Sequence, residues 1–224
     1  MLSVILPTLN AERLLGPTLA ALVPGVVQGL VKDLVIADGG SSDGTVRIAE
    51  DAGATLVQTT PGRGTQLAAG ADAARADWFL FLHADTILAD GWWADVQRIM
   101  ATNPGKAAVF RFVLDDVGFR ARLVEKAVRL RCAFFGLPYG DQGLLISRAL
   151  YEEVGGFADY PLMEDVDIVR RIGRRRILLL DTPAVTSASR YAKDGYLRRI
   201  GRNAACLILF FSGMAPKRIA RLYG

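Results

Sequence analysis

A histidine and an aspartate, His83 and Asp85, follow directly on the apolar run 78–82. An unbroken apolar run of this length is typical of a strand buried on both faces inside a parallel sheet. Side chains at alternate positions point the same way, so the two residues can share one small, hard target at the carboxyl end of that strand. A metal ion that holds a phosphate is such a target. The alternative is that Asp85 caps the next turn and His83 bonds a loop carbonyl.

Three acidic residues, Glu164, Asp165 and Asp167, lie within one predicted helical turn. Carboxylates this close repel one another, which raises the pKa of at least one of them and suits a group that accepts a proton near neutral pH. The alternative is structural, because the helix dipole favours acids in a first turn. Arginines at helical spacing in residues 170–176 could also neutralise them.

Glycine-rich loops follow two other predicted strands. Asp38 precedes Gly39 and Gly40, which allow a ligand close to the backbone, and its carboxylate can accept a hydrogen bond from a base or a ribose hydroxyl. Arg63 stands between two glycines ahead of a predicted helix, which suits a phosphate. Both loops also fit an ordinary turn with a helix cap. Neither the dinucleotide-binding Gly-x-Gly-x-x-Gly fingerprint nor the phosphate-binding P-loop occurs.

The elements that must position these residues alternate between strand and helix. The strands predicted in the first half of the chain are residues 3–6, 34–37, 55–58 and 78–82. This alternation predicts an α/β fold with a Rossmann-like, mostly parallel sheet and helices on both faces. The second half is less regular. Its predicted strands are residues 108–114, 144–147 and 177–180, and its predicted helices are 92–100, 120–135, 149–154, 163–172 and a tail from 196.

Composition sets limits on these expectations. The chain has 224 residues, of which 51% are hydrophobic, and a formal net charge of +4 at pH 7, which suits one large α/β domain over residues 1–224. No signal-like segment follows Met1, and the longest apolar run, 204–211, is far shorter than the roughly 20 residues that span a bilayer, so we expect a cytoplasmic protein. Cys132 and Cys206 suit reduced core thiols. The late excess of arginine favours an anionic ligand or surface, without a nucleic-acid partner.

Five sequence motifs follow one another along the chain. They are Ser3-Val-Ile-Leu-Pro-Thr-Leu-Asn10, Ala37-Asp-Gly-Gly-Ser-Ser-Asp-Gly-Thr45, Phe81-Leu-His-Ala-Asp85, Gly155-Gly-Phe157 and Met163-Glu-Asp-Val-Asp167. Their order and spacing resemble the family-two glycosyltransferases over nearly the whole chain, and most closely a small bacterial branch in which the metal motif reads His-Ala-Asp. The resemblance implies a GT-A fold, a nucleotide-diphosphate sugar donor, a divalent cation (Mn²⁺ or Mg²⁺) and inversion at the anomeric carbon.

The resemblance also implies roles for single residues. The residues that would line the donor are Pro7, Thr8, Asn10, Glu12 and Asp38. Asp85 would bind the metal, and Asp165 would be the general base, with Glu164 beside it. His83 stands where the family usually has an acidic residue. Whether His83 contacts the metal, the ribose or neither of them is therefore left open by the resemblance.

Four further site residues are expected from their place in the chain. Asp141 and Gln142 lie in the glycine-flanked turn 139–143, where polar side chains can reach a hydroxyl-bearing acceptor, although an ordinary Asp turn is the alternative. Arg63 and Arg190 could place cations on the donor diphosphate.

The chain is thus expected to divide into a nucleotide-binding half (1–90), an acceptor-binding and catalytic half (91–195) and a helical tail (196–224). Arginines and lysine surround the apolar centre of the tail, residues 206–211. This pattern is compatible with weak, salt-sensitive contact with an anionic membrane and with a lipid-linked acceptor. The alternative, which we favour slightly, is that the apolar centre packs on the core.

The predicted reaction is a single, inverting transfer in which metal charge stabilises the leaving diphosphate while Asp165 deprotonates the acceptor hydroxyl. The absence of a Gln-x-x-Arg-Trp motif argues against processive polymer synthesis. Two alternatives remain. A sugar-phosphate nucleotidyltransferase would place a glycine- and arginine-rich loop after the first strand, where this chain has Pro7-Thr-Leu-Asn10. The other alternative is a catalytically idle protein that binds sugar nucleotides.

Overall fold

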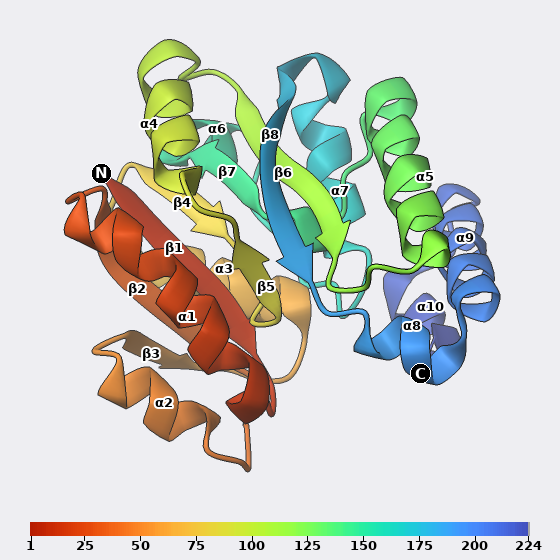
Figure 1. The fold of residues 1–224 in the computed structure, drawn as a ribbon, viewed down its shortest axis with the longest axis horizontal. Helices are drawn as coiled ribbons and strands as arrows, with labels where there is room; N and C mark the ends of the chain where they lie inside the picture. The colour runs from red at the N-terminus through yellow and green to blue at the C-terminus, as the bar shows by residue number, and fades with distance from the viewer. Residues whose placement is uncertain (224) are drawn as a thin grey trace.

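An eight-stranded sheet forms the centre of the computed structural model, which describes residues 1–223 apart from the side chains of Arg190 and Tyr223 (Figure 1). The strand order is β3-β2-β1-β4-β7-β6-β8-β5. The strands are β1 (Leu2–Thr8), β2 (Val31–Asp38), β3 (Thr55–Gln58), β4 (Trp78–Phe81), β5 (Thr86–Leu88), β6 (Ala107–Leu114), β7 (Leu144–Ser147) and β8 (Ile177–Thr186). The helices are α1 (Glu12–Val27), α2 (Thr45–Asp51), α3 (Arg63–Ala73), α4 (Trp92–Thr102), α5 (Phe119–Phe135), α6 (Arg148–Glu153), α7 (Glu164–Ile172), α8 (Ser189–Asp194), α9 (Tyr196–Phe211) and α10 (Pro216–Tyr223), with short 3-10 turns at Gly140–Gln142 and Arg174–Arg176.

The first four strands are parallel, as the sequence predicts. β1 pairs with β2 on one side and with β4 on the other, and β3 continues the sheet beyond β2. Val4 and Leu6 of β1 point into one core layer and Ile5 into the other, and all three are fully buried. Both faces of the strand are therefore covered, which explains the unbroken apolar runs.

The sheet as a whole has more parallel than antiparallel strand pairs, as predicted, but its second half is mixed. β7 runs antiparallel to both β4 and β6, and β5 runs antiparallel to β8, while β6 and β8 are parallel. Strand direction is not visible in a short apolar run, because burial on both faces gives the same composition in either direction. The expected fold class nevertheless holds, since helices cover both faces of one α/β sheet.

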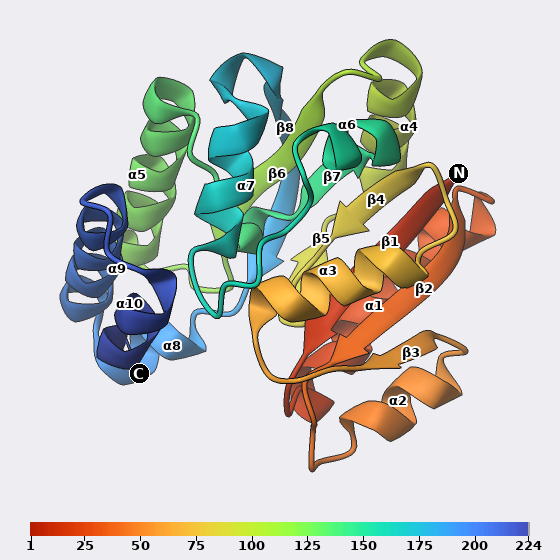
Figure 2. The same cartoon turned by 180° about the vertical axis from the view of Figure 1, so that it is seen from behind.

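Two helical layers enclose the sheet. α1 and α4 pack on one face, where Trp92 of α4 is buried and donates a hydrogen bond to the carbonyl of Ala21. α3, α6 and α7 cover the other face, as Figure 2 shows from behind. In that layer the Phe157 ring meets the Phe81 ring edge to face, with 4.8 Å between their centroids.

The tail is helical, as predicted, and forms α9 and α10, with the short helix α8 just before it. Cys206 and Ile219 are buried against Met163 and Val166 at the start of α7, so one face of the tail packs on the core, as the favoured alternative predicts. α9 lies beside α5 in both views (Figures 1 and 2). Among the helices described, none combines the length and the apolar character needed to cross a bilayer.

Candidate active site

The polar residues singled out in the sequence meet at one edge of the sheet. β1, β2 and β4 are parallel, so the segments that follow Thr8, Asp38 and Phe81 emerge on the same side. β7 is antiparallel to β4, and its first residue, Leu144, pairs with Phe81. The turn that precedes β7 therefore also reaches this edge, beside His83.

A donor-side cleft opens at the ends of β1 and β4. Six of the residues predicted to bind donor or metal line it, namely Pro7, Thr8, Asn10, Arg63, His83 and Asp85. Gln66 lies in its floor and was not predicted. Its amide donates to the carbonyls of Thr8 (2.7 Å) and Ala37 (2.8 Å), which ties α3 to the ends of β1 and β2.

Asp38 holds the loop after β2. Its carboxylate accepts hydrogen bonds from the hydroxyls of Thr8 (2.8 Å) and Ser41 (2.5 Å) and from the backbone N–H groups of Gly40 (3.0 Å) and Ser41 (2.8 Å). Burial raises the pKa of Asp38, but these hydrogen bonds outweigh burial and leave the pKa below its ordinary value. Four accepted bonds use the acceptor capacity of a carboxylate. Asp38 is buried and holds the loop beside the cleft, and its expected contact with base or ribose stays a prediction.

Asn10 and Glu12 hold the same loop from the other side. The Asn10 side-chain oxygen accepts from the N–H of Ser42 (2.9 Å), and a Glu12 oxygen accepts from the N–H of Gly44 (3.2 Å). Asn10 adopts a left-handed backbone (φ 51°), which asparagine tolerates better than most residues. Asn10 lines the donor-side cleft, whereas Glu12 is not among the residues that line it.

A second cleft, of about 110 Å³, adjoins the first. Arg63, His83 and Asp85 line both. The other residues of the second cleft include Tyr139, Asp141 and Asp165, together with Thr186, Ser187, Tyr191, Arg199 and Asn203 from β8 and the tail. The residues from β8 and the tail were not predicted, because only the fold brings residues this distant in the chain to the site. The expected diphosphate contact of Arg190 concerns a side chain outside the described residues.

Asp165, in the second cleft, is held by two backbone groups. Its carboxylate accepts hydrogen bonds from the N–H of Gly140 (2.8 Å) and from the N–H of Val166 (2.8 Å). A Cβ atom at residue 140 would lie 2.7 Å from Nε2 of His83, so only glycine allows the turn to approach so closely. The turn 139–143 thus brings His83 and Asp165 together.

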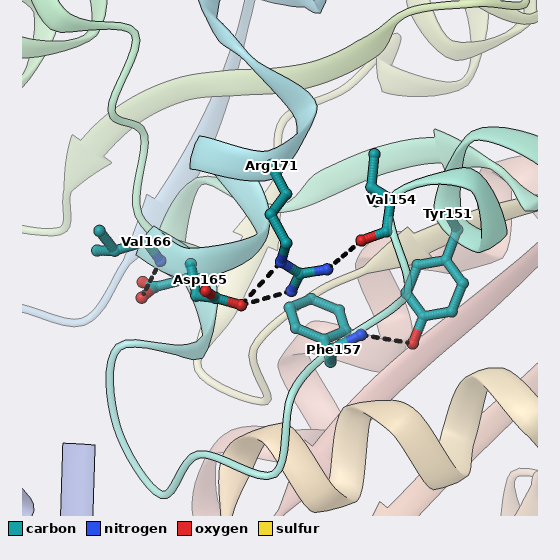
Figure 3. A network of polar contacts seen from close by, with 7 residues as sticks. Tyr151, Val154, Phe157, Asp165, Val166 and Arg171 are labelled. Atoms are coloured by element: carbon teal, nitrogen blue, oxygen red, sulfur yellow. Dashed lines mark hydrogen bonds and ion pairs between the residues drawn. The ribbon is translucent and has the colours of Figure 1, made fainter. Parts of the chain in front are cut away.

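Helix α7 carries Asp165 and is anchored behind it. The Arg171 guanidinium binds Asp167 in the first turn of the helix and donates to the carbonyl of Val154 (Figure 3). Figure 3 also shows the N–H of Phe157 donating to the hydroxyl of Tyr151 (3.1 Å). Arg171 therefore links the first turn of α7 to the segment just before the motif Gly155-Gly-Phe157.

Glu164 is buried beside Asp165, with 1% of its surface exposed. Within the described residues neither carboxylate oxygen has a hydrogen-bond partner, and Nη1 of Arg63 lies 4.0 Å from one of them. Burial, and next the Asp165 carboxylate, raise the pKa of Glu164 from 4.5 to about 8, although Arg63 lowers it in part. Glu164 therefore carries a proton at neutral pH in the absence of ligands.

This pKa shift predicts how stability depends on pH. The folded chain binds a proton at Glu164 that the unfolded chain releases above pH 4.5, so the stabilisation is present below that pH and is lost as the pH rises through about 8. Glu164→Gln is neutral at every pH. The difference in unfolding free energy between the variant and the original chain should rise as the pH increases from 4.5 to about 8. The expected rise, in favour of the variant, is on the order of two to four kcal/mol. Denaturant unfolding at several pH values measures it, and parallel curves for the two proteins would refute the shift.

The two residues predicted to face the acceptor differ in their surroundings. Asp141 lines the second cleft, and burial raises its pKa to about 6, although the charge of Arg131 opposes that rise. Gln142 is 1% exposed, and its amide donates to the carbonyl of Phe110 (2.9 Å) and accepts from the N–H of Tyr139 (3.3 Å). Gln142 is therefore a core residue that folds the turn, because its polar atoms satisfy nearby backbone groups. Its expected contact with the acceptor stays a prediction.

The Gly-Arg-Gly motif positions Arg63 by close packing. Gly64 donates its N–H to the carbonyl of Tyr160 (3.0 Å). A Cβ atom at residue 64 would lie 2.0 Å from the carbonyl oxygen of Ala158. The first turn of α3 therefore docks on residues 158–160 without room for a side chain, which holds Arg63 between the two clefts.

Gly64→Ala should consequently destabilise the fold. The clash is with backbone, so we expect a loss of about 3 kcal/mol or more in the free energy of unfolding. Gly201→Ala, in α9, is the matched control because a Cβ atom there meets nothing within 4 Å. That change should be neutral or stabilising by up to about 1 kcal/mol. Thermal or urea unfolding of both variants measures the difference, and equal stabilities would contradict the packing described.

The residues at the junction fit a divalent cation that the donor helps to bind. In the described part of the chain, no group of three or more His, Cys, Asp or Glu side chains is placed to hold a metal ion alone. Asp85, at the junction, offers a hard carboxylate oxygen, with His83 two residues before it. Mg²⁺ in phosphate-transfer sites is commonly held by one or two carboxylates, water and substrate phosphates. The donor set therefore suits a metal that arrives with a diphosphate.

The fold is an α/β sheet whose strands end at two adjoining clefts. Residues 3–177 match the model of the family described as Glycosyl transferase family 2. This match covers most of the chain, and the protein belongs to glycosyltransferase family 2.

Known relatives agree with this assignment. The glucosyl-3-phosphoglycerate synthase of Mycolicibacterium paratuberculosis is 35% identical over 95 residues, which cover 38% of this chain and 29% of that protein. A solved structure of the synthase from Mycobacterium tuberculosis, in complex with Mn²⁺, UDP and glucosyl-3-phosphoglycerate, has a TM-score of 0.60 and 23% identity, covering 82% of this chain and 70% of the other. A complex of the same enzyme with Mn²⁺ and UDP-glucose has a TM-score of 0.60 and 22% identity over 83% and 71%. These structures confirm the predicted fold.

Proposed function

We propose that this protein transfers a single glycosyl group from a uridine-diphosphate sugar to an acceptor hydroxyl, with inversion and with Mn²⁺ or Mg²⁺. The observation that carries the proposal is the junction of two clefts at Arg63, His83 and Asp85. The donor-side cleft has the loops of a nucleotide site, and the second cleft exposes a carboxylate, Asp165. The choice of uridine diphosphate and of the cation rests on the ligands of the structurally similar synthase.

The roles of the residues follow from their positions. Asp85 would hold the cation, which, when bound, neutralises the charge of the leaving diphosphate. Arg63 would add a second positive charge at the same junction. Asp165 would take the proton of the acceptor hydroxyl, whose oxygen forms the new bond to the anomeric carbon on the face opposite the breaking carbon–oxygen bond. The electron pair of the broken bond leaves with the nucleoside diphosphate.

Glu164 would act as a positioning residue in this scheme. A buried, protonated carboxylic acid next to Asp165 adds no negative charge of its own beside the proposed base. Asp141 would contact the acceptor from the turn 139–143. The mycobacterial synthase forms complexes with phosphoglyceric acid, but at this identity the likeness leaves the acceptor of the present chain open.

A panel of sugar nucleotides tests the proposal. The protein should release free nucleoside diphosphate slowly from one of them when Mn²⁺ is present, and this release should stop with EDTA. Release of pyrophosphate from a nucleoside triphosphate and a sugar phosphate would instead identify a nucleotidyltransferase. Binding of sugar nucleotides without any release of nucleoside diphosphate would instead indicate a protein that binds sugar nucleotides without catalysing a reaction.

A further inference from the structure

A large apolar hollow lies between α5 and α9, which run side by side (Figures 1 and 2). Its volume is about 700 Å³, and its walls are mainly hydrophobic. The apolar residues that line it include Phe119, Leu123, Ala127, Leu197, Ile200 and Leu207. Phe119 is 76% exposed and Leu197 86% exposed. Contiguous exposed apolar surface of this kind marks a place where a partner or ligand binds.

The hollow is continuous with the acceptor side of the proposed active site. Four residues, Tyr139, Asp141, Tyr191 and Asn203, line both the hollow and the second cleft. The second cleft also contains Asp165, the proposed base. A molecule lying between α5 and α9 would therefore have one end beside the carboxylate that accepts the proton.

The shared end of the hollow holds two buried polar atoms that lack hydrogen bonds. Among the described residues, neither Nη2 of Arg131 nor Oδ1 of Asp141 has a partner. The Arg131 guanidinium is fixed over the Tyr139 ring, 3.4 Å from its centroid, and its Nε donates to the carbonyl of Leu137 (2.8 Å). Buried polar groups are nearly always satisfied, so a donor and an acceptor held here indicate a ligand with a polar head.

From this arrangement we infer that the acceptor is an amphiphile with a hydroxyl-bearing head at Arg131 and Asp141 and an apolar chain between α5 and α9. The inference rests on the proposed transferase function and specifies its acceptor. A second copy of this chain is the less suitable occupant, because a protein surface seated on the hollow would cover the four shared residues and close the second cleft. An apolar chain between α5 and α9 leaves the second cleft open, so the polar head of the same molecule can enter it.

Alkyl glucosides of increasing chain length provide a direct test. Each has a sugar hydroxyl head, and methyl, hexyl and octyl glucosides are used below the concentrations at which they form micelles. Equilibrium binding to the full chain, measured by calorimetry with Mn²⁺ and UDP present, should strengthen by up to about fourfold for each methylene that enters the hollow. Binding that does not change with chain length would overturn the inference.

Ala127→Trp distinguishes the hollow from nonspecific binding. Ala127 is an exposed residue of α5 that lines the hollow, so the indole should fill it without disturbing the core. The variant should no longer bind longer chains more tightly, and its affinity for octyl glucoside should fall at least tenfold. Ala20→Trp, at an exposed position of α1 outside the hollow, is the matched control and should keep that dependence. Equal behaviour of the two variants would count against the hollow.

Two further measurements separate the ways in which the test can fail. The molar mass in solution shows whether a second copy occupies the hollow, since a dimer that Ala127→Trp dissociates would overturn the inference. Slow release of nucleoside diphosphate from the donor does not depend on the acceptor chain. If donor hydrolysis occurs without chain-length dependence, the proposed transferase stands and the amphiphilic acceptor falls. If chain-length dependence is found without donor hydrolysis, the proposed transferase falls.

Discussion

Replacing Asp165 by Asn is expected to lower the rate of glycosyl transfer by a factor of roughly 100 to 10,000, the range that a positioned general base contributes. The amide keeps the size of the carboxylate but cannot take the acceptor proton. Asp165 lines the second cleft and not the donor-side cleft, so the donor should still bind with little change in its dissociation constant. The loss should therefore appear in kcat, with the donor KM largely preserved.

The matched control for this prediction is Asp167→Asn. Asp167 lies in the same helical turn, but its carboxylate pairs with Arg171 and does not line either cleft. The same chemical change there should cost stability and leave most of the turnover. Steady-state kinetics with donor and acceptor varied separately, on variants confirmed as folded by circular dichroism, make the comparison. Similar losses of kcat in the two variants would mean that Asp165 acts through the fold.

Asp85→Asn is expected to abolish the effect of Mn²⁺ on nucleotide binding. The substitution removes one negative charge and almost no volume at the junction of the two clefts. A metal that stabilises a leaving diphosphate contributes several kcal/mol to the transition state, so transfer should fall by roughly 100-fold or more. The affinity for UDP without metal should stay the same, because the cavity keeps its shape.

Calorimetric titration of UDP, with Mn²⁺ and then with EDTA, measures this effect. The original chain should bind more tightly with the metal, and Asp85→Asn should bind equally in both conditions. Asp90→Asn provides the control, because Asp90 is an exposed residue that lines neither cleft. If Mn²⁺ still strengthens UDP binding in Asp85→Asn, the cation is held by residues other than Asp85.

The sequence by itself determined much of the donor half. Short apolar runs predicted β1, β2 and β4, and the alternation of strands with helices predicted that these strands and β3 are parallel. Parallel strands place their following loops at one edge, so the meeting of Thr8 and His83 follows from local patterns alone. The five ordered motifs likewise identified the family, which the match over residues 3–177 confirms.

The tertiary structure decided what the polar residues around that edge do. Asp38 and Gln142 satisfy backbone groups inside the fold, although their residue types suit a ligand equally well. The antiparallel direction of β7 brings Gly140 to Asp165, and the tail lines part of the second cleft and forms the hollow with α5. These features depend on contacts between segments far apart in the chain. Local pattern cannot predict them, because burial and hydrogen-bond partners are fixed only when those segments pack together.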